Sequence, residues 1–262
     1  MRSGMDLSIL KRNLKTIKKQ FQQAEPYPHV IIENFLKRPM AEKLLREFPS
    51  VEDMRASSAF SGVAEKKSQL SDIEKMPKLF QGVFKDLMSS EFRSFVSQIS
   101  GIKPVLPDPD LTGGGLHQGG DGSFLDIHAD FNKHPKTGKY RRLNILIYLN
   151  KNWKESYGGY LEIWDKDMKS CVKSVAPVFN RCLIFATDKQ SHHGYPVMHL
   201  PPGVTRKSMA AYYYSDQPAV GEDMEYHTTL FKARPGEFKS ALYMLLSSKL
   251  VQRLRTWLKN LA

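Results

Sequence analysis

The segment GSFLDIHADFN, residues 122–132, decides how the rest of the sequence is interpreted. Its run of apolar and β-branched residues predicts a strand. Residues two apart in a strand project from the same face, so His128 and Asp130 should point together. An imidazole and a carboxylate on one face supply two ligands of a facial iron triad, which leaves positions for O₂ and a chelating co-substrate. Phe124 and Asp126 share that face, and we expect them either to line the pocket or to pack beneath it.

A third ligand is expected from a distant strand, because His-x-Asp alone arises easily by chance in a chain with eight histidines. His192 and His193 precede a glycine, 64 and 65 residues after His128. Neighbouring strand residues face opposite sides, so only one of the two can readily bind the same metal, and spacing leaves open which one. Surface or loop positions are predicted for His117, His134 and His199.

A fourth feature is a basic residue at the start of the apolar run SMAAYYYS, residues 208–215. Arg206 and Ser208 would share one face of that strand. A guanidinium forms two parallel hydrogen bonds with a carboxylate, and the serine hydroxyl can add a third. The pair therefore suits the distal carboxylate of a dicarboxylate co-substrate such as 2-oxoglutarate.

Short apolar runs separated by turns fill the middle of the chain and predict a β-sandwich or barrel. They are FLDIHADF (124–131), LNILIYLN (143–150), YLEIWD (160–165), CLIFAT (182–187) and SMAAYYYS (208–215). Helices are expected at 6–24, 40–48, 71–100 and 237–261, and a strand at 29–35. The predicted fold is mainly β with helical N- and C-terminal additions. We expect one structural domain with three parts: a helical region 1–103, a catalytic core 104–216, and a basic amphipathic helix within 217–262.

The net charge of +12 is concentrated at the two ends of the chain. Residues 1–20 hold six Lys/Arg and one Asp, and residues 231–262 hold seven Lys/Arg and one Glu. Two cysteines make no disulfide framework, and the early charges do not resemble a signal peptide. We therefore expect a cytoplasmic protein. Nucleic acid is not an expected partner, because the core lacks interleaved aromatic and basic residues.

The order His-x-Asp, His, Arg-x-Ser is more specific than any of its parts. Over roughly residues 104–216, the chain resembles the prolyl-4-hydroxylase-like branch of the Fe(II)/2-oxoglutarate dioxygenases. The similar motifs are HADFN (128–132), RRLNILIYLN (141–150), GGYLEIWD (158–165), NRCLIF (180–185), HGYP (193–196) and RKS (206–208). The resemblance implies a double-stranded β-helix, or jelly roll, as the core.

The same resemblance implies a set of site residues and cofactors. The implied metal ligands are His128, Asp130 and His193, the last because the family places its histidine directly before this glycine. Arg206 and Ser208 would bind 2-oxoglutarate, on a pocket wall that also includes residues near Tyr140 and Asn144. The cofactors would be Fe(II), 2-oxoglutarate and O₂, with ascorbate as an optional reductant. The implied reaction is hydroxylation of an unactivated C–H bond with release of succinate and CO₂.

Two alternatives to a dioxygenase of unidentified substrate stay open on the sequence. One is a non-enzymatic β-helix protein that binds a small molecule. The other is the same chemistry on a lipid-linked acidic sugar at an anionic membrane, because residues 238–261 carry an apolar stripe with flanking Lys/Arg. The simpler account of that stripe is packing against the core or against the basic N-terminal helix.

Overall fold

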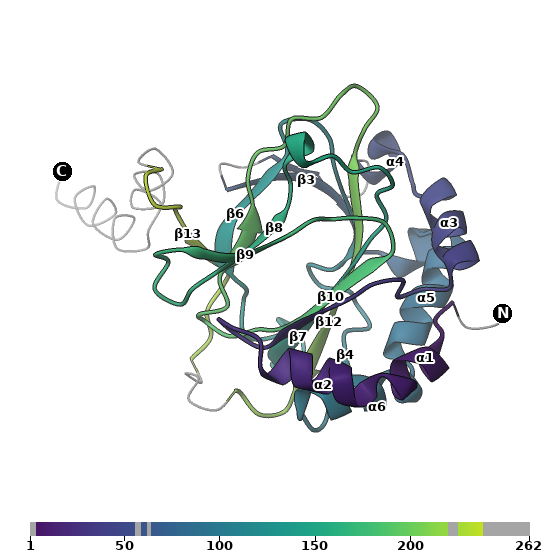
Figure 1. The fold of residues 1–262 in the computed structure, drawn as a ribbon, viewed down its shortest axis with the longest axis vertical. Coiled ribbons are helices and arrows are strands. Elements are labelled where there is room, and N and C mark those ends of the chain that lie inside the picture. Colours follow the sequence, from purple (N-terminus) through teal and green to yellow (C-terminus); the bar gives the residue numbers. More distant parts are fainter. Residues whose placement is uncertain (1–3, 56–58, 62–63, 220–224, 238–262) are drawn as a thin grey trace.

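The computed structural model describes residues 4–55, 59–61, 64–219 and 225–237 (Figure 1). Its helices are α1 (Leu7–Arg12), α2 (Leu14–Gln22), α3 (Arg38–Arg46), α4 (Val51–Arg55), α5 (Lys78–Met88) and α6 (Ser90–Ser100), with short 3₁₀ turns η1 (Ile73–Lys75) and η2 (Glu155–Tyr157). The helix predicted at 6–24 is divided in two at Asn13. Asp6 begins α1 by accepting hydrogen bonds from the backbone N–H groups of Ser8 and Ile9. The helix predicted at 237–261 lies almost wholly outside the described residues.

The strands form one strongly curled, mostly antiparallel sheet. They are β1 (His29–Ile32), β2 (Ala59–Ser61), β3 (Glu65–Leu70), β4 (Leu106–Pro107), β5 (Gly115–Gly119), β6 (Phe124–Ala129), β7 (Tyr140–Tyr148), β8 (Leu161–Trp164), β9 (Cys171–Val175), β10 (Arg181–Ala186), β11 (His193–Tyr195), β12 (Arg206–Ser215) and β13 (Leu230–Lys232). Their order is β1-β10-β7-β12-β5-β3-β6-β11-β8-β9, with β13 on β6, β2 on β3 and β4 on β12. This is the predicted jelly-roll core.

Side chains of the central strands β7 and β12 point alternately to the apolar core under the helices and to the interior of the curled sheet. Their outward residues join the helices in one large apolar core: Leu143, Ile145, Ile147, Met209, Ala211 and Tyr213. The helices of the N-terminal region cover this outer face, as Figure 1 shows. The alternate residues, among them Asn144 and Ser208, face the interior of the curl. The helical layer therefore stabilises the sheet from outside and leaves its concave face for a site.

Two strands that the sequence did not predict flank β6 on the same edge. β3 pairs with the first half of β6, where Glu65 lies opposite Leu125. β13 pairs with the second half, where Phe231 lies opposite His128. The region before residue 105, expected to be mainly helical, thus supplies a strand to the middle of the sheet, and residues after 216 supply another. No helix in the described part of the chain is long and apolar enough to cross a membrane.

Candidate active site

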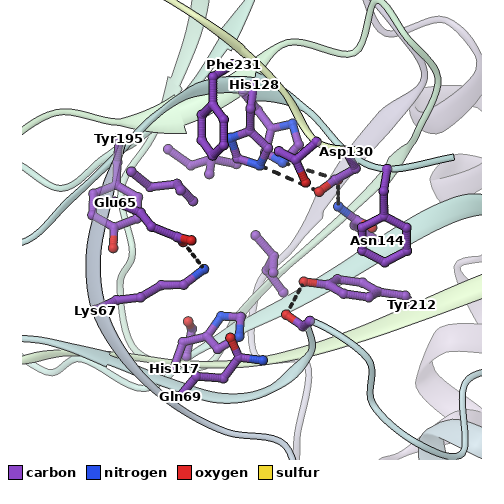
Figure 2. A pocket seen from close by; sticks show the side chains of 18 of the residues that line it. Glu65, Lys67, Gln69, His117, His128, Asp130, Asn144, Tyr195, Tyr212 and Phe231 are labelled. Atoms are coloured by element: carbon purple, nitrogen blue, oxygen red, sulfur yellow. Dashed lines mark hydrogen bonds and ion pairs between the residues drawn. The ribbon is translucent and has the colours of Figure 1, made fainter. Parts of the chain in front are cut away.

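A cavity of about 190 Å³ opens inside the curled sheet (Figure 2). Strands from both halves of the curl line it, and the residues predicted from the sequence as metal ligands and carboxylate binders lie in its wall. The predicted residues present are His128, Asp130, Asn144, His193, Arg206 and Ser208. Tyr140 is not among the lining residues; its ring lies beside the Lys133 ammonium, 4.9 Å from the ring centroid.

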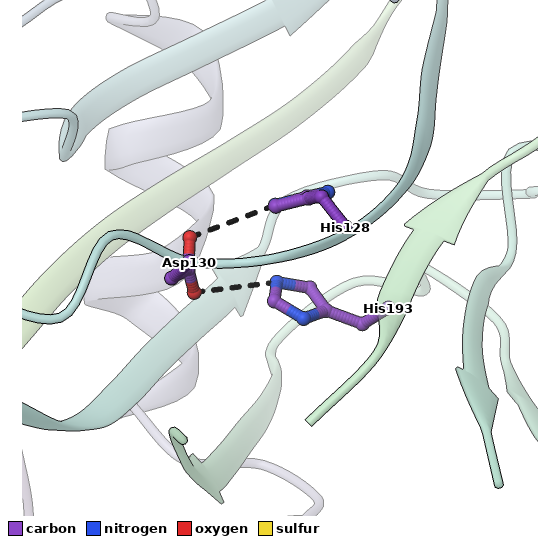
Figure 3. A group of neighbouring side chains, drawn as sticks. All are labelled: His128, Asp130 and His193. Atoms are coloured by element: carbon purple, nitrogen blue, oxygen red, sulfur yellow. Dashed lines mark ion pairs between the residues drawn. The ribbon is translucent and has the colours of Figure 1, made fainter. Parts of the chain in front are cut away.

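Three candidate ligands meet at one end of the cavity (Figure 3). The Nε2 atom of His128 lies 3.5 Å from Oδ1 of Asp130, and the Nε2 atom of His193 lies 3.5 Å from Oδ2. His193 is opposite His128 in the pairing of β11 with β6, which brings the two imidazoles together. One ligand atom from each residue falls within 4.8 Å of the others. His192, the alternative that spacing left open, is outside this cluster.

Both histidines are oriented so that Nε2 faces the cluster. The Nδ1 atom of His128 lies 2.9 Å from the Asp126 carbonyl oxygen, and that of His193 lies 2.9 Å from the Ser191 carbonyl oxygen. A carbonyl can only accept, so Nδ1 carries the proton and donates, which leaves the Nε2 lone pair free for a ligand. Burial, and after it the nearby His128, lower the pKa of His193 to about 3, so this ring is neutral.

Asp130 is held by two partners that the sequence did not assign to it. Asn144 Nδ2 donates to Asp130 Oδ2 at 2.8 Å, and the Arg141 guanidinium lies 3.1 Å from the same oxygen. Burial on its own raises the pKa of Asp130. The charge of Arg141, followed by the two histidines, outweighs burial and holds that pKa well below the usual range. The carboxylate is therefore ionised and ready to bind a cation.

A second group of polar side chains gathers around Arg206. Its guanidinium carbon lies 4.3 Å from the ring centroid of Tyr195 and 5.0 Å from that of Tyr148, and its Nε donates to the Gly159 carbonyl at 2.8 Å. Among the residues that the structure describes, the buried Tyr148 hydroxyl meets no hydrogen-bond partner of suitable geometry. A buried hydroxyl beside a guanidinium is suited to an anionic ligand. Strand alternation from Asn144 could have indicated Tyr148 in advance.

Two register shifts explain why the cavity wall departs from strict strand alternation. On β6, His128 and Leu125 lie opposite His193 and Tyr195, so four residues of β6 match three of β11 and the alternation shifts. Leu125 therefore lines the cavity, whereas Phe124 and Asp126 do not. A similar shift on β7, opposite residues 213–214 of β12, brings Arg141 as well as Asn144 into the cavity and excludes Tyr140.

Strands β3 and β5 supply a polar wall that the sequence did not reveal. Glu65 and Lys67 form an ion pair at 3.0 Å, and Figure 2 shows them across the cavity from Asp130 and Asn144. Gln69 continues the same face of β3, and His117 of β5 lies beside it. His117 lies in β5 and lines the cavity, so the prediction of a surface or loop position was wrong for it. His134 lies in the loop between β6 and β7, as predicted, but is buried 3.2 Å from Asp108, and His199 is exposed as predicted.

The C-terminal strand β13 closes the cavity beside the candidate ligands. The Phe231 ring lies 5.6 Å from the His128 ring, between centroids, and Thr229 also lines the cavity. Arg234 fixes this segment to the sheet: its Nε lies 2.8 Å from Glu162 and its Nη1 3.4 Å from Asp126. Part of the site therefore comes from residues after 216, where only a helix was expected.

The donor set fits Fe(II). Two neutral imidazole nitrogens and one carboxylate oxygen are the ligands of a facial triad, which binds one side of the metal and leaves the other side open. The hydrogen bonds that fix both Nδ1 atoms are the outer-shell contacts that metal-binding histidines need. His128, Asp130 and His193 are the residues that would hold the ion.

The jelly-roll fold and this cluster can now be compared with known proteins. Residues 114–214 match the model of the 2OG-Fe(II) oxygenase superfamily. The superfamily is named for Fe(II) and 2-oxoglutarate, the cofactors expected from the sequence. All seven predicted site residues, Tyr140 included, lie within the matched segment.

Curated relatives and solved structures are also similar to this chain. Prolyl 3-hydroxylase OGFOD1 of Mus musculus is 25% identical over 72% of this chain and 33% of its own length. Prolyl hydroxylase EGLN3 of Homo sapiens is 35% identical over 36% of each chain. The chain thus spans about a third of the length of these relatives.

A Trichoplax adhaerens prolyl hydroxylase in complex with a hypoxia inducible factor peptide fragment has a TM-score of 0.56 at 20% identity, covering 83% of this chain and 98% of its own. A Pseudomonas putida prolyl-4-hydroxylase has a TM-score of 0.51 at 15% identity, covering 76% and 98%, and both structures show the shared fold.

Proposed function

We propose that this protein is an Fe(II)- and 2-oxoglutarate-dependent hydroxylase. The observation that carries the proposal is the convergence of His128, Asp130 and His193 at one end of a cavity in a 2OG-Fe(II) oxygenase fold. With 2-oxoglutarate and O₂, bound Fe(II) supplies the oxidising power for C–H hydroxylation, and succinate and CO₂ are released.

In this proposal, different residues of the chain bind the metal, bind the co-substrate and exclude water. His128, Asp130 and His193 hold the metal. Arg206 binds the distal carboxylate of 2-oxoglutarate, and the Tyr148 hydroxyl, which lies behind the cavity wall beside this guanidinium, supports the same contact. Ser208 lies on the same wall and can add a hydroxyl contact. Phe131, Tyr212 and Phe231 supply the apolar surface that limits water near the reacting C–H bond.

The metal assignment is tested with single substitutions of the candidate ligands. Purified protein supplied with Fe(II) and 2-oxoglutarate should form succinate slowly even without substrate. His128→Ala and His193→Ala should abolish metal binding and succinate formation, because each removes one of three ligands. His192→Ala is the matched control, one residue away and outside the cluster, and should retain both. Undiminished succinate formation in His193→Ala would contradict the assignment.

For the substrate, we propose a protein-bound proline as the first class to test. The support is that the curated relatives are named as prolyl hydroxylases. The polar ion pair Glu65–Lys67 faces the metal end across a small cavity, which suits entry of one side chain with polar backbone groups beside it. The alternative of a lipid-linked acidic sugar was based on residues 238–261, which lie outside the described residues.

The substrate proposal predicts a gain of one oxygen atom on proline-containing peptides. The measurement is mass spectrometry of a peptide panel incubated with enzyme, Fe(II), 2-oxoglutarate and ascorbate, with fragmentation to locate the oxygen. Matched peptides with alanine in place of each proline are the control. Oxygen gained equally by the alanine peptides would exclude proline as the target.

A further inference from the structure

We propose that Arg141 and Asn144 are positioning residues that make Asp130 bind the metal through one carboxylate oxygen, Oδ1. The inference rests on the metal site of the proposed function. It gives Asn144 a different role from the co-substrate contact that the resemblance implied. It also assigns a role to Arg141, a residue for which the sequence predicted none.

The two oxygens of Asp130 have unequal surroundings. Oδ2 receives a hydrogen bond from Asn144 Nδ2 at 2.8 Å and forms an ion pair with Arg141 Nη2 at 3.1 Å. Each oxygen also lies 3.5 Å from one imidazole, Oδ1 from His128 Nε2 and Oδ2 from His193 Nε2. The hydrogen bond of Asn144 and the ion pair of Arg141 both fall on Oδ2, so Oδ1 is the oxygen more available to a metal.

Arg141 and Asn144 are joined to each other as well as to Asp130. Arg141 Nε donates to Asn144 Oδ1 at 2.9 Å. This bond fixes the orientation of the Asn144 amide, because its oxygen must accept from Arg141 and its nitrogen must then donate to Asp130. The three side chains form a closed triangle of polar contacts, in which movement of one member would break bonds to the other two.

The Arg141 guanidinium is held rigidly between aromatic rings. Its carbon lies 3.4 Å from the ring centroid of Tyr212 and 4.6 Å from that of Phe131, and the residue is 2% exposed. The Tyr212 hydroxyl is itself fixed by donating to the Gly113 carbonyl at 2.8 Å. Stacking of this kind suits arginine, whose planar cation packs on aromatic faces, and does not suit lysine. The residue that orients Asp130 is therefore itself unable to change rotamer easily.

Binding of the metal through a single oxygen of Asp130 would keep a coordination position open for the co-substrate or O₂. A facial triad leaves half of an octahedral metal open for a two-point co-substrate and O₂. A carboxylate that bound through both oxygens would take one of those positions. By engaging Oδ2, Arg141 and Asn144 preserve the open side of the metal.

A positioning role and a purely electrostatic role of Arg141 predict opposite effects of its removal on metal affinity. A cation beside a metal site repels the metal, so removing it should tighten metal binding if charge is all that matters. If Arg141 instead orients Asp130, removing it should weaken metal binding. Loss of an outer-shell partner typically lowers metal affinity by about 10- to 100-fold.

The test measures Mn(II) binding to the metal-free full chain by isothermal titration calorimetry, followed by 2-oxoglutarate binding to the Mn(II)-loaded protein. Arg141→Met and the near-isosteric Asn144→Leu should each weaken Mn(II) binding by about 10- to 100-fold, and 2-oxoglutarate binding with it. Arg141→Lys should restore only part of the Mn(II) affinity, since an ammonium cannot contact both Asp130 and Asn144 as the guanidinium does. Arg206→Met is the matched control: it removes a buried cation of the same cavity that contacts Gly159 and the tyrosines, and it should weaken 2-oxoglutarate binding alone.

The outcomes separate this inference from the proposed function. If wild-type protein binds Mn(II) but Arg141→Met and Asn144→Leu bind it equally well or more tightly, the positioning role is overturned and the metal site stands. If the wild type binds no Mn(II), the proposed function fails and the inference fails with it. Thermal unfolding reports whether each variant folds, and if Arg141→Met does not, Asn144→Leu decides, because it keeps the Arg141 charge.

Discussion

Asp130 and Arg141 form a buried ion pair in which each residue compensates for the burial of the other. Removing one partner of such a pair leaves an uncompensated charge, which costs about 3–5 kcal/mol. We expect Asp130→Ala to lower the free energy of unfolding of metal-free protein by about this amount, measured by urea denaturation. The double variant Asp130→Ala/Arg141→Met should be more stable than Asp130→Ala, since no lone charge remains. A double variant no more stable than the single one would show that the pair is not coupled.

Arg206 and Tyr148 should together determine the affinity for 2-oxoglutarate. Arg206→Lys keeps the charge but loses the two-point contact with a carboxylate, and a charge-assisted hydrogen bond is worth about 1.5–3 kcal/mol. The affinity for 2-oxoglutarate should therefore fall by about 10- to 100-fold. Tyr148→Phe, which removes one hydroxyl, should weaken binding by less. Titration of 2-oxoglutarate into metal-loaded protein measures both, and unchanged affinity in Arg206→Lys and Arg206→Ala would refute the role.

Strand β13 is an element whose place in the site depends on Arg234. Arg234→Ala removes the contacts with Glu162 and Asp126 that fix β13 beside β6. We expect faster amide hydrogen exchange in residues 225–237, measured by mass spectrometry, because the segment opens at a lower free energy. Arg181→Ala is the control, since Arg181 makes a similar 2.8 Å contact with Glu33 far from the cavity. Equal acceleration of exchange in residues 225–237 by both variants would argue against a specific role for Arg234.

Sequence patterns predicted the elements that carry strong periodicity and missed those whose environment is unusual. Strands β6, β7, β8, β10 and β12 have apolar residues on a buried face, so alternation revealed them. Strand β3 (EKKSQL) was missed because one of its faces lines a polar cavity, which gives it the composition of a loop. Strand β13 has three residues, too few for any period.

His128 and Asp130 could be paired from the sequence because residues two apart in an extended segment face the same way, whereas the choice of His193 over His192 came from the family resemblance. The partners of Asp130 could not be predicted, because Arg141 and Asn144 enter the cavity together only where a bulge shifts the alternation of β7. The same shifts keep Tyr140, Phe124 and Asp126 out of the cavity wall, which leaves Phe124 and Asp126 with the structural role that was their other expected possibility. Bulges are set by pairing between strands, and a single sequence does not record that pairing.

At the scale of the whole molecule, the positive charge of the two chain ends leads to a prediction about membranes. If the basic C-terminal stripe binds an anionic surface, the protein should co-sediment with anionic but not neutral liposomes, and salt should release it. Each basic residue near such a surface contributes about 1 kcal/mol. Deletion of residues 248–262 should abolish binding while circular dichroism shows the chain still folded. Protein that stays in the supernatant at low salt, or a deletion that unfolds it, would support packing of the stripe instead.

The two strands that share one edge of β6 divide the cavity wall into a part inside the segment that matches the family model and a part outside it. The candidate metal and co-substrate residues lie inside the matched segment 114–214, whereas Glu65, Lys67 and Phe231 reach the cavity from outside it. If the site works as proposed, substitutions in β3 or β13 should change which molecule is accepted while metal binding is retained. Replacing residues 64–70 and 225–237 by the corresponding segments of a relative tests this division of the cavity wall.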